Sequence, residues 1–183
     1  MADSDDKRNF TDKLLSSDTN AKRVSEIEDQ LDADTKEAYR LRHLADLQPM
    51  GMVSTGGYQA GNDSARGNGM EILLARRFFA AVERGDAITV LAYIRIGYDI
   101  NIRRERLDDT ALHIAAARDA KDVLKLLIES RQCDFLMRDN RGRLASEMAY
   151  LFGGNPAVAR LLGNKERKQG KVQGVSVTRR SMV

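Results

Sequence analysis

The sequence is poor in the residues that build cross-links, metal sites and catalytic sites. Its 183 residues include one cysteine, Cys133, so no disulfide can form within the chain and a reducing compartment, the cytoplasm, is expected. Only two histidines occur, His43 and His113, and no pair of Cys or His residues has the spacing of zinc ligands. We therefore expect no cofactor, no metal site, no small-molecule substrate and no catalytic activity.

Long apolar runs are also missing. No stretch approaches the roughly 18 apolar residues that a membrane-spanning helix needs, so no membrane span is expected. The first residues contain no basic segment followed by an apolar run, which indicates that they are not a signal peptide. Tryptophan is absent and aromatic residues make up 5% of the chain, so the core should consist mainly of aliphatic side chains.

Charge is distributed unevenly along the chain. Residues 1–48 contain 12 acidic and 8 basic residues, whereas residues 163–183 contain one acidic residue, Glu166, and six basic ones. Blocks of this kind are typical of interaction segments. For the basic end, contact with nucleic acid, contact with an anionic membrane and a merely solvated tail all stay open. For the acidic end, docking onto a basic face of the same chain is a further hypothesis.

The N-terminal third differs in pattern from the centre. Residues 1–17 are polar and expected to be disordered. Residues 18–48 predict a helical extension in the form of a hairpin, with Asp32 or Asp34 capping its second helix, that packs on the centre or on a partner. The apolar residues that set the first helical period are Val24, Ile27 and Leu31. Residues 49–69 are rich in glycine and predict a flexible linker.

A repeat with a period of 34 residues occupies the centre of the chain. Ala81, Ala115 and Ala149 stand at the same place in three apolar segments, and each segment is followed by a second helical pattern. Helix pairs repeated at this period stack into a solenoid, and small residues at the shared position let neighbouring helices approach closely. The sequence therefore predicts an all-α helical-pair solenoid over residues 70–163, followed by a basic disordered tail over residues 164–183.

Three motifs in this segment resemble those of ankyrin repeats. Thr110-Ala-Leu-His-Ile-Ala-Ala116 resembles the Thr-Pro-Leu-His-x-Ala-Ala signature, Gly97-Tyr-Asp-Ile-Asn101 resembles the Gly-Ala-Asp-Val-Asn ending, and Asp139-Asn-Arg-Gly142 resembles the opening of a repeat. The resemblance covers about half of the chain. It implies an array of about three ankyrin repeats with degenerate outer repeats. It also implies a non-catalytic adaptor or regulator that mediates protein–protein interaction.

Cap and turn residues agree with this assignment. Thr110 stands where a helix N-cap belongs, and His113, three residues later, completes a capping box. Asn155-Pro156 has the residues of an N-cap and a first helical position. Gly142 closes a turn that needs a positive φ, which other residues resist.

Ankyrin repeats bind partners through the tips of their finger-like loops and the exposed faces of their first helices, and the resemblance carries these positions onto this chain. Seven of these fourteen positions are arginines, which donate planar, bidentate hydrogen bonds to carboxylates and phosphates. The predicted partner-binding residues are Arg84, Arg103, Arg106, Leu107, Arg118, Arg138, Arg141 and Arg143. The expected partner is a protein with an acidic surface. The alternatives are a nucleic acid bound by the same face and the basic tail, a secreted bacterial effector that acts by binding, and arginines that are only solvated.

Overall fold

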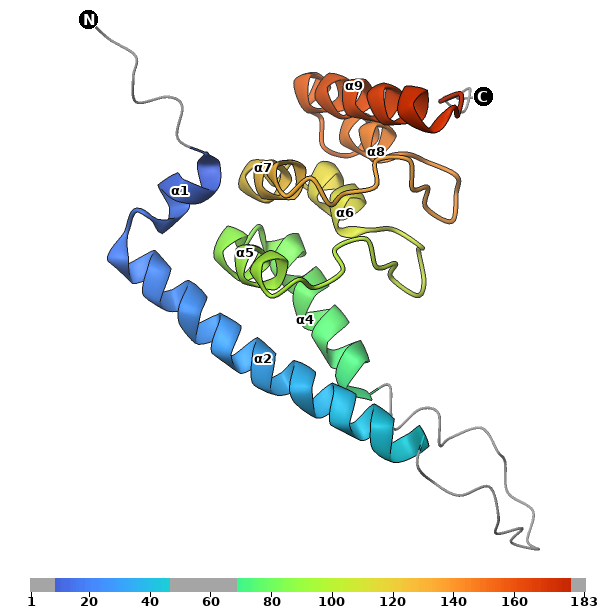
Figure 1. Cartoon of the computed structure of the whole chain (residues 1–183). Coiled ribbons are helices and arrows are strands. Elements are labelled where there is room, and N and C mark those ends of the chain that lie inside the picture. Colours follow the sequence, from blue (N-terminus) through green and yellow to red (C-terminus); the bar gives the residue numbers. More distant parts are fainter. Residues whose placement is uncertain (1–8, 47–68, 179–183) are drawn as a thin grey trace, which may run out of the picture.

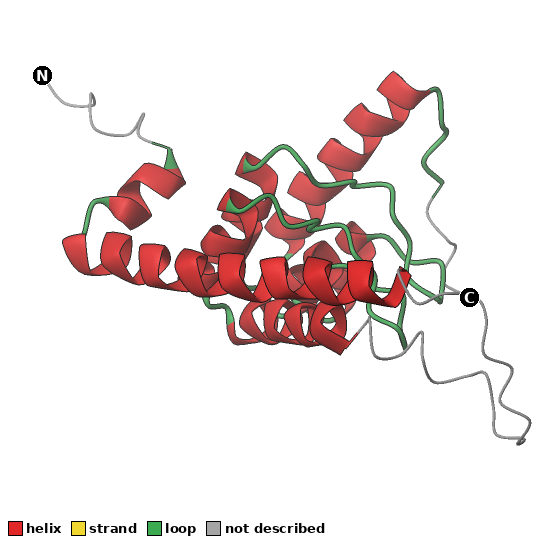
Figure 2. Ribbon diagram, turned by 60° about the horizontal axis from the view of Figure 1, so that its bottom comes forward, coloured by secondary structure: helices red, strands yellow, loops and turns green. Residues whose placement is uncertain are grey.

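The computed structural model describes residues 9–46 and 69–178, with side chains over 9–36 and 71–178. Within these ranges every regular element is a helix (Figure 2), which confirms the all-α prediction. The helices are α1 (Phe10–Leu15), α2 (Asp18–Asp46), α4 (Gly69–Arg84), α5 (Ala87–Arg95), α6 (Ala111–Ala117), α7 (Lys121–Glu129), α8 (Ala145–Leu151) and α9 (Pro156–Gln173). In this part of the chain no helix is both long and apolar enough to span a bilayer. All but the last residue of the predicted linker 49–69 lie outside the described ranges.

Three helix pairs stack one on the next, as the repeat predicts (Figure 1). The first helices of the pairs, α4, α6 and α8, pack in one row, and α5 packs on α7 in a second row. Ala81, Ala115 and Ala149 are fully buried at the contacts of the first row. A methyl group is all that fits where two helix backbones approach closely, so the 34-residue spacing of alanine reflects the stacking itself.

Two long loops connect the pairs and project from the same side of the array (Figure 1). We call residues 96–110 finger 1 and residues 130–144 finger 2. The Asn101 side chain joins them, because its Nδ2 donates to the Gln132 carbonyl at 2.8 Å and its Oδ1 accepts from the Asp134 amide at 2.8 Å. Nearer the tips, the Asn140 amide donates to the Leu107 carbonyl at 2.9 Å. The fingers therefore form one hydrogen-bonded layer.

The helical extension is a single helix and not the predicted hairpin. No glycine or proline interrupts residues 18–46, and Asp32 and Asp34 lie within α2. Val24 and Leu31 are buried where α2 packs across α4 and α5. This long contact keeps the helix continuous, because a break would withdraw one half from the surface that stabilises it.

Ion pairs fix α2 across the first helix pair. Asp34 binds Arg77 of α4 at 2.6 Å, and Glu28 binds Arg95 of α5 at 3.1 Å. The acidic segment thus docks on the repeats, but on the end of the array and not on the predicted arginine face. Its role in the structure is to cover the apolar side of the first pair, which has no preceding repeat.

Helix α1 lies within the segment that the sequence predicts to be disordered, which corrects the prediction for residues 10–15. Glu129 of α7 accepts hydrogen bonds from the Phe10 amide at 3.4 Å and from the Thr11 hydroxyl at 3.5 Å. Lys125 lies 4.7 Å from the centre of the Phe10 ring. An acidic side chain at a helix start satisfies free amides and opposes the positive end of the helix dipole. This partner comes from a distant part of the sequence and is invisible in residues 1–17 alone.

The predicted start of the disordered tail at residue 164 is also wrong, because α9 continues to Gln173. The reason is Glu166, which is buried against α8 and accepts hydrogen bonds from the amide and hydroxyl of Ser146 at 2.9 and 2.6 Å. Beyond α9 the chain turns at Gly174 and runs back toward finger 2, where the Thr178 carbonyl accepts from Arg138 at 2.9 Å. Residues 179–183, with the remaining basic residues of the tail, lie outside the described ranges.

Candidate functional site

Six of the eight predicted partner-binding residues are exposed at the surface. Two lie where the chain turns from the first to the second helix of a pair, at equivalent places of successive repeats: Arg84 is the last residue of α4, and Arg118 follows α6. Three lie on finger 1 and one on finger 2, namely Arg103, Arg106, Leu107 and Arg141. Because the fingers are joined and the two turns are one repeat apart, the structure arranges these residues in two columns along the array.

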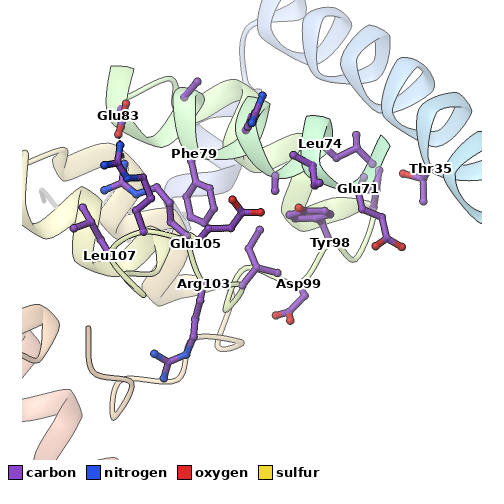
Figure 3. Close-up of a pocket in the computed structure, with 18 of the residues that line it drawn as sticks. Thr35, Glu71, Leu74, Phe79, Glu83, Tyr98, Asp99, Arg103, Glu105 and Leu107 are labelled. Carbon is purple, nitrogen blue, oxygen red and sulfur yellow. Dashed lines mark hydrogen bonds and ion pairs between the residues drawn. The ribbon is translucent and has the colours of Figure 1, made fainter. Parts of the chain in front are cut away.

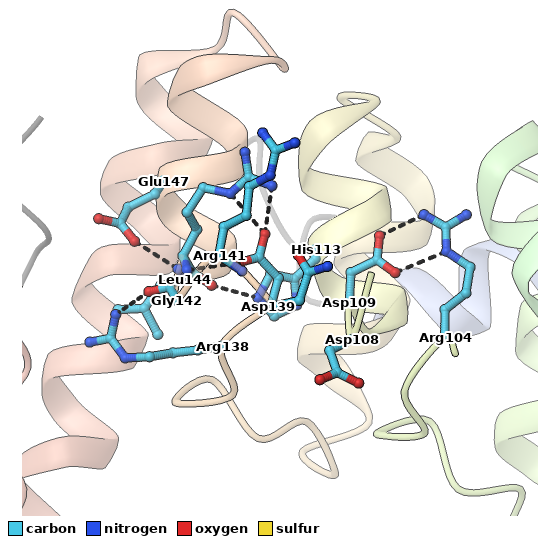
Figure 4. Close-up of polar contacts among 12 residues, drawn as sticks. Arg104, Asp108, Asp109, His113, Arg138, Asp139, Arg141, Gly142, Leu144 and Glu147 are labelled. Atoms are coloured by element: carbon cyan, nitrogen blue, oxygen red, sulfur yellow. Dashed lines mark hydrogen bonds and ion pairs between the residues drawn. The ribbon is translucent and has the colours of Figure 1, made fainter. Parts of the chain in front are cut away.

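The other two predicted residues, Arg138 and Arg143, are half-buried and serve the fold of finger 2 (Figure 4). Arg143 binds the Asp139 carboxylate with its Nε at 2.8 Å and an Nη at 2.6 Å. Arg138 donates to the Gly142 carbonyl at 2.6 Å. A tight turn leaves backbone carbonyls without partners in the loop itself, and Arg138 donates to one of them. Arg143 instead holds the carboxylate of Asp139 in the turn. We therefore exclude both residues from the candidate binding surface.

Asp139 organises the turn at which finger 2 reverses. Its carboxylate is buried and accepts hydrogen bonds from the amides of Arg141 and Arg143 at 2.9 and 2.8 Å. Burial alone would raise the pKa of Asp139, but the side-chain and backbone hydrogen bonds from Arg143 and the amide of Arg141 outweigh it and lower the pKa. Gly142 has a φ of 74°, as the sequence predicts. The turn therefore holds a charged carboxylate at neutral pH.

His113 links the start of α6 to finger 2, and the predicted capping box is confirmed. The Thr110 amide donates to Nδ1 at 3.3 Å, so the proton of the neutral ring lies on Nε2 and is donated to the Arg143 carbonyl at 3.1 Å. Burial lowers the pKa of His113, because the charged ring would lose its hydration. Both ring nitrogens are occupied, which leaves this histidine no free atom for acid–base chemistry.

Arg104 is a structural residue that the sequence analysis missed. It donates two hydrogen bonds of 2.9 and 2.6 Å to Asp109 (Figure 4). It also donates to Glu83 of α4 at 2.6 Å. These contacts raise the pKa of Arg104, the hydrogen bond to Asp109 contributing most. Arg103, its neighbour, points the other way and donates to the Arg138 carbonyl of finger 2 at 2.8 Å. Side chains of successive residues in an extended loop point to opposite sides, and this is the only sequence signal that distinguishes Arg104 from Arg103.

A groove lies between α4 and finger 1, next to the exposed residues of the finger (Figure 3). Apolar side chains line it, among them Phe79, Ile102 and Leu107. Charged side chains of both signs line it as well, with Arg103 and Arg106 on its finger side and the carboxylates of Glu71, Glu83, Asp99 and Glu105. Its volume of about 1290 Å³ exceeds the roughly 300–1,000 Å³ of ordinary small-molecule pockets. The groove is therefore suited to a segment of another macromolecule that combines apolar and charged residues.

The one cysteine does not have the surroundings of a nucleophile. The thiol of Cys133 donates to the Leu127 carbonyl at 3.2 Å, and burial raises its pKa to about 12. A nucleophilic cysteine needs a lowered pKa, whereas this thiol stays protonated at neutral pH. No group of three His, Cys, Asp or Glu side chains in the described ranges is placed to hold a metal ion.

A family model described as ankyrin repeats (3 copies) matches residues 78–172, which is just over half of the sequence. The matched region begins within α4 and ends within α9, so it includes all three helix pairs and both fingers. No match was found among curated proteins. Ankyrin repeats generally mediate protein–protein interaction, and proteins of this type are typically not enzymes. The repeat period, the capping box of α6, the paired helices and this match agree, and the chain belongs to the ankyrin-repeat family.

Proposed function

We propose that this chain is a cytoplasmic, non-catalytic adaptor or regulator that binds an acidic surface of a partner protein. The proposed binding surface, called the finger face below, consists of the groove between α4 and finger 1 together with Arg84, Arg103, Arg106, Leu107, Arg118 and Arg141. One observation carries the proposal: a partly apolar groove, larger than ordinary small-molecule pockets, adjoins exposed arginines on two fingers that hydrogen bonds join.

The chemistry of the finger face fits a protein partner. Protein interfaces combine an apolar centre with a polar rim, and arginine is enriched in them because its guanidinium binds carboxylates in a planar, bidentate manner. Leu107 is 41% exposed beside Arg106 and offers an apolar anchor within reach of a charged contact. A helix or loop of the partner that carries Asp or Glu beside an apolar residue would satisfy both.

Arg106 and Arg118 are the most informative positions for a test. Both side chains are exposed, and neither forms an ion pair with a described residue, so their replacement leaves the described side-chain contacts of the fold intact. They also stand in different columns of the finger face, one on finger 1 and the other after α6. A partner that spans the face has to contact both.

The experiment compares the partners that full-length wild type and R106E/R118E retain, measured by quantitative affinity capture followed by mass spectrometry. The matched control is K22E/K36E, which makes the same change of net charge at two exposed positions of α2, outside the finger face. We expect the double variant of the finger face to lose partners that both the wild type and the control retain. Recovery of the same partners at the same levels by all three proteins would refute the proposal.

A further inference from the structure

The surface of α9 turned away from α8 carries a row of basic side chains. Arg160, Arg167, Lys168 and Lys171 are exposed, and their spacing of seven, eight and eleven residues from Arg160 places them on one side of a helix. We call these four residues the basic stripe. At 1.5 Å per residue it extends over about 16 Å. Three of these residues, Arg167, Lys168 and Lys171, therefore lie on a helix, although the sequence predicts a disordered tail from residue 164.

The basic stripe has no acidic counterpart in the described part of the chain. Arginines on other elements form ion pairs, for example Arg77 with Asp34 at 2.6 Å and Arg95 with Glu28 at 3.1 Å. Among described contacts, the stripe has only a hydrogen bond from Arg167 to Asn164 at 2.5 Å. The single acidic residue of α9, Glu166, lies on the opposite side and is buried against α8. The exposed side of the helix is therefore positive along its whole length.

The position of α9 leaves the basic stripe open. Helix α9 forms the end of the array opposite to α2 (Figure 1). The chain after α9 folds back on the other side of the helix, where Val175 donates to the Gly170 carbonyl at 2.8 Å and leaves no room for a side chain at Gly170. Two apolar residues border the stripe, Leu161 at 47% exposure and Val172 at 83%.

We propose that the basic stripe of α9 docks the protein on an anionic lipid surface, separately from the partner bound by the finger face. A bilayer with anionic headgroups presents continuous negative charge. Each basic side chain of the stripe can therefore lie next to a headgroup, and no acidic side chain in the row is repelled. The bordering apolar side chains enter the interface between headgroups and acyl chains, as they do in other surface-bound helices. The contact is peripheral and reversible.

The apolar border favours lipid over nucleic acid. A nucleic-acid interface of this kind would bury phosphates against the arginines and lysines, and aromatic side chains would normally stack on the bases. Helix α9 has no aromatic residue. Val172, which borders the stripe and is 83% exposed, gains nothing from contact with phosphates but is stabilised by contact with acyl chains.

The test measures binding of the full chain to vesicles by flotation, with phosphatidylcholine alone and with phosphatidylcholine plus phosphatidylserine. We expect binding only to the anionic vesicles and its loss at high salt. Each cation contributes about fivefold to the partition coefficient, so R167Q/K171Q should bind about 25-fold more weakly. The control K22Q/K36Q, with the same loss of charge at exposed positions of α2, should bind like the wild type. Circular dichroism establishes that the variants are folded, and R160Q/K168Q serves as a second pair with the same expected loss.

Three results would overturn the proposal. The first is no binding of the folded wild type to anionic vesicles at low salt. The second is an equal loss in K22Q/K36Q, which would make the effect one of net charge alone. The third is tighter binding to a DNA duplex or single-stranded RNA than to the vesicles at the same ionic strength, lost in R167Q/K171Q, which would assign the stripe to nucleic acid instead.

Discussion

Among single residues, Arg131 stands out because it adopts a left-handed backbone conformation that arginine disfavours. Its φ is 57°, and it lies exposed at the start of finger 2, two residues after the end of α7. The left-handed region costs a non-glycine residue about 1–2 kcal/mol, part of which glycine offsets by its greater freedom in the unfolded chain. We predict that Arg131→Gly raises the free energy of unfolding in urea by about 0.5–1 kcal/mol.

The control for this prediction is an arginine in a regular helix. Arg160→Gly, at an exposed position within α9, should lower the free energy of unfolding by about 1 kcal/mol because glycine is a poor helix former. A destabilised Arg131→Gly protein would show that the side chain contributes more than the backbone strain removes.

His113 gives the stability of the protein a pH dependence of known sign. Burial lowers its pKa in the folded state below the ordinary 6.5, so between these two values the unfolded chain binds a proton that the folded chain does not. Stability therefore falls as the pH drops below about 6.5. Urea unfolding across this range should show the slope in wild type and a weaker slope in His113→Gln, and equal slopes would contradict the assignment.

Asp139 affects stability in a lower pH range than His113, because its hydrogen bonds lower the pKa of its carboxyl group. Its stabilising effect is present above the ordinary value of 3.8 and is lost as the pH falls through the lower value in the folded state. The loss of stability near pH 6 thus belongs to the histidine, whereas the loss in strong acid includes the carboxylate of finger 2.

At the scale of elements, the join between α8 and α9 depends on one buried carboxylate. Glu166 accepts hydrogen bonds from the Ser146 amide and hydroxyl. Glu166→Ala leaves both donors buried without this acceptor, which should lower the free energy of unfolding by about 2 kcal/mol. Lys168→Ala, two residues later on the exposed side, should change it little. Similar losses in both variants would mean that helix propensity and not the buried contact is responsible.

The same elements show what the sequence could predict. The capping box of Thr110 and His113 and the N-cap at Asn155 depend on residues close in sequence, and both predictions are confirmed. The length of α9 depends on Ser146, twenty residues before Glu166, and the order of α1 depends on Glu129, more than a hundred residues away. Contacts at such separation leave no periodic signal in the segment that they order.

The candidate site divides in the same way. The finger positions of Arg106 and Leu107 followed from the repeat register, and both side chains are exposed. Arg138 and Arg143 share that register but are drawn inward by the Gly142 carbonyl and the Asp139 carboxylate. The repeat register predicts that a residue lies on a finger. The hydrogen-bond partners of its side chain depend on the conformation of that finger, which the register does not give. Binding through the finger face itself stays a prediction.

At the scale of the whole molecule, α2 acts as the cap of the array. Leu31 is buried between α2 and the first helix pair, and removing its side chain leaves a cavity in that contact. We predict that Leu31→Ala lowers the free energy of unfolding by about 2–4 kcal/mol in urea titration. Asp29→Ala, exposed on the same helix, should have little effect.

A single cooperative transition is expected for both proteins, because repeats stabilise one another mainly through their shared interfaces. If Leu31→Ala unfolded in two steps, with α2 released first, the extension would be an independent arm and not part of the folded unit.

The hydrogen bonds that Asn101 and Asn140 make between the fingers bear on how fast and how tightly a partner is captured. Loops that are ordered before the encounter surrender little conformational freedom on association, so more of the contact energy remains as affinity. They also require no slow rearrangement, which keeps the association rate close to that of two rigid bodies. Even an array of only three repeats then presents a recognition surface in its finished shape.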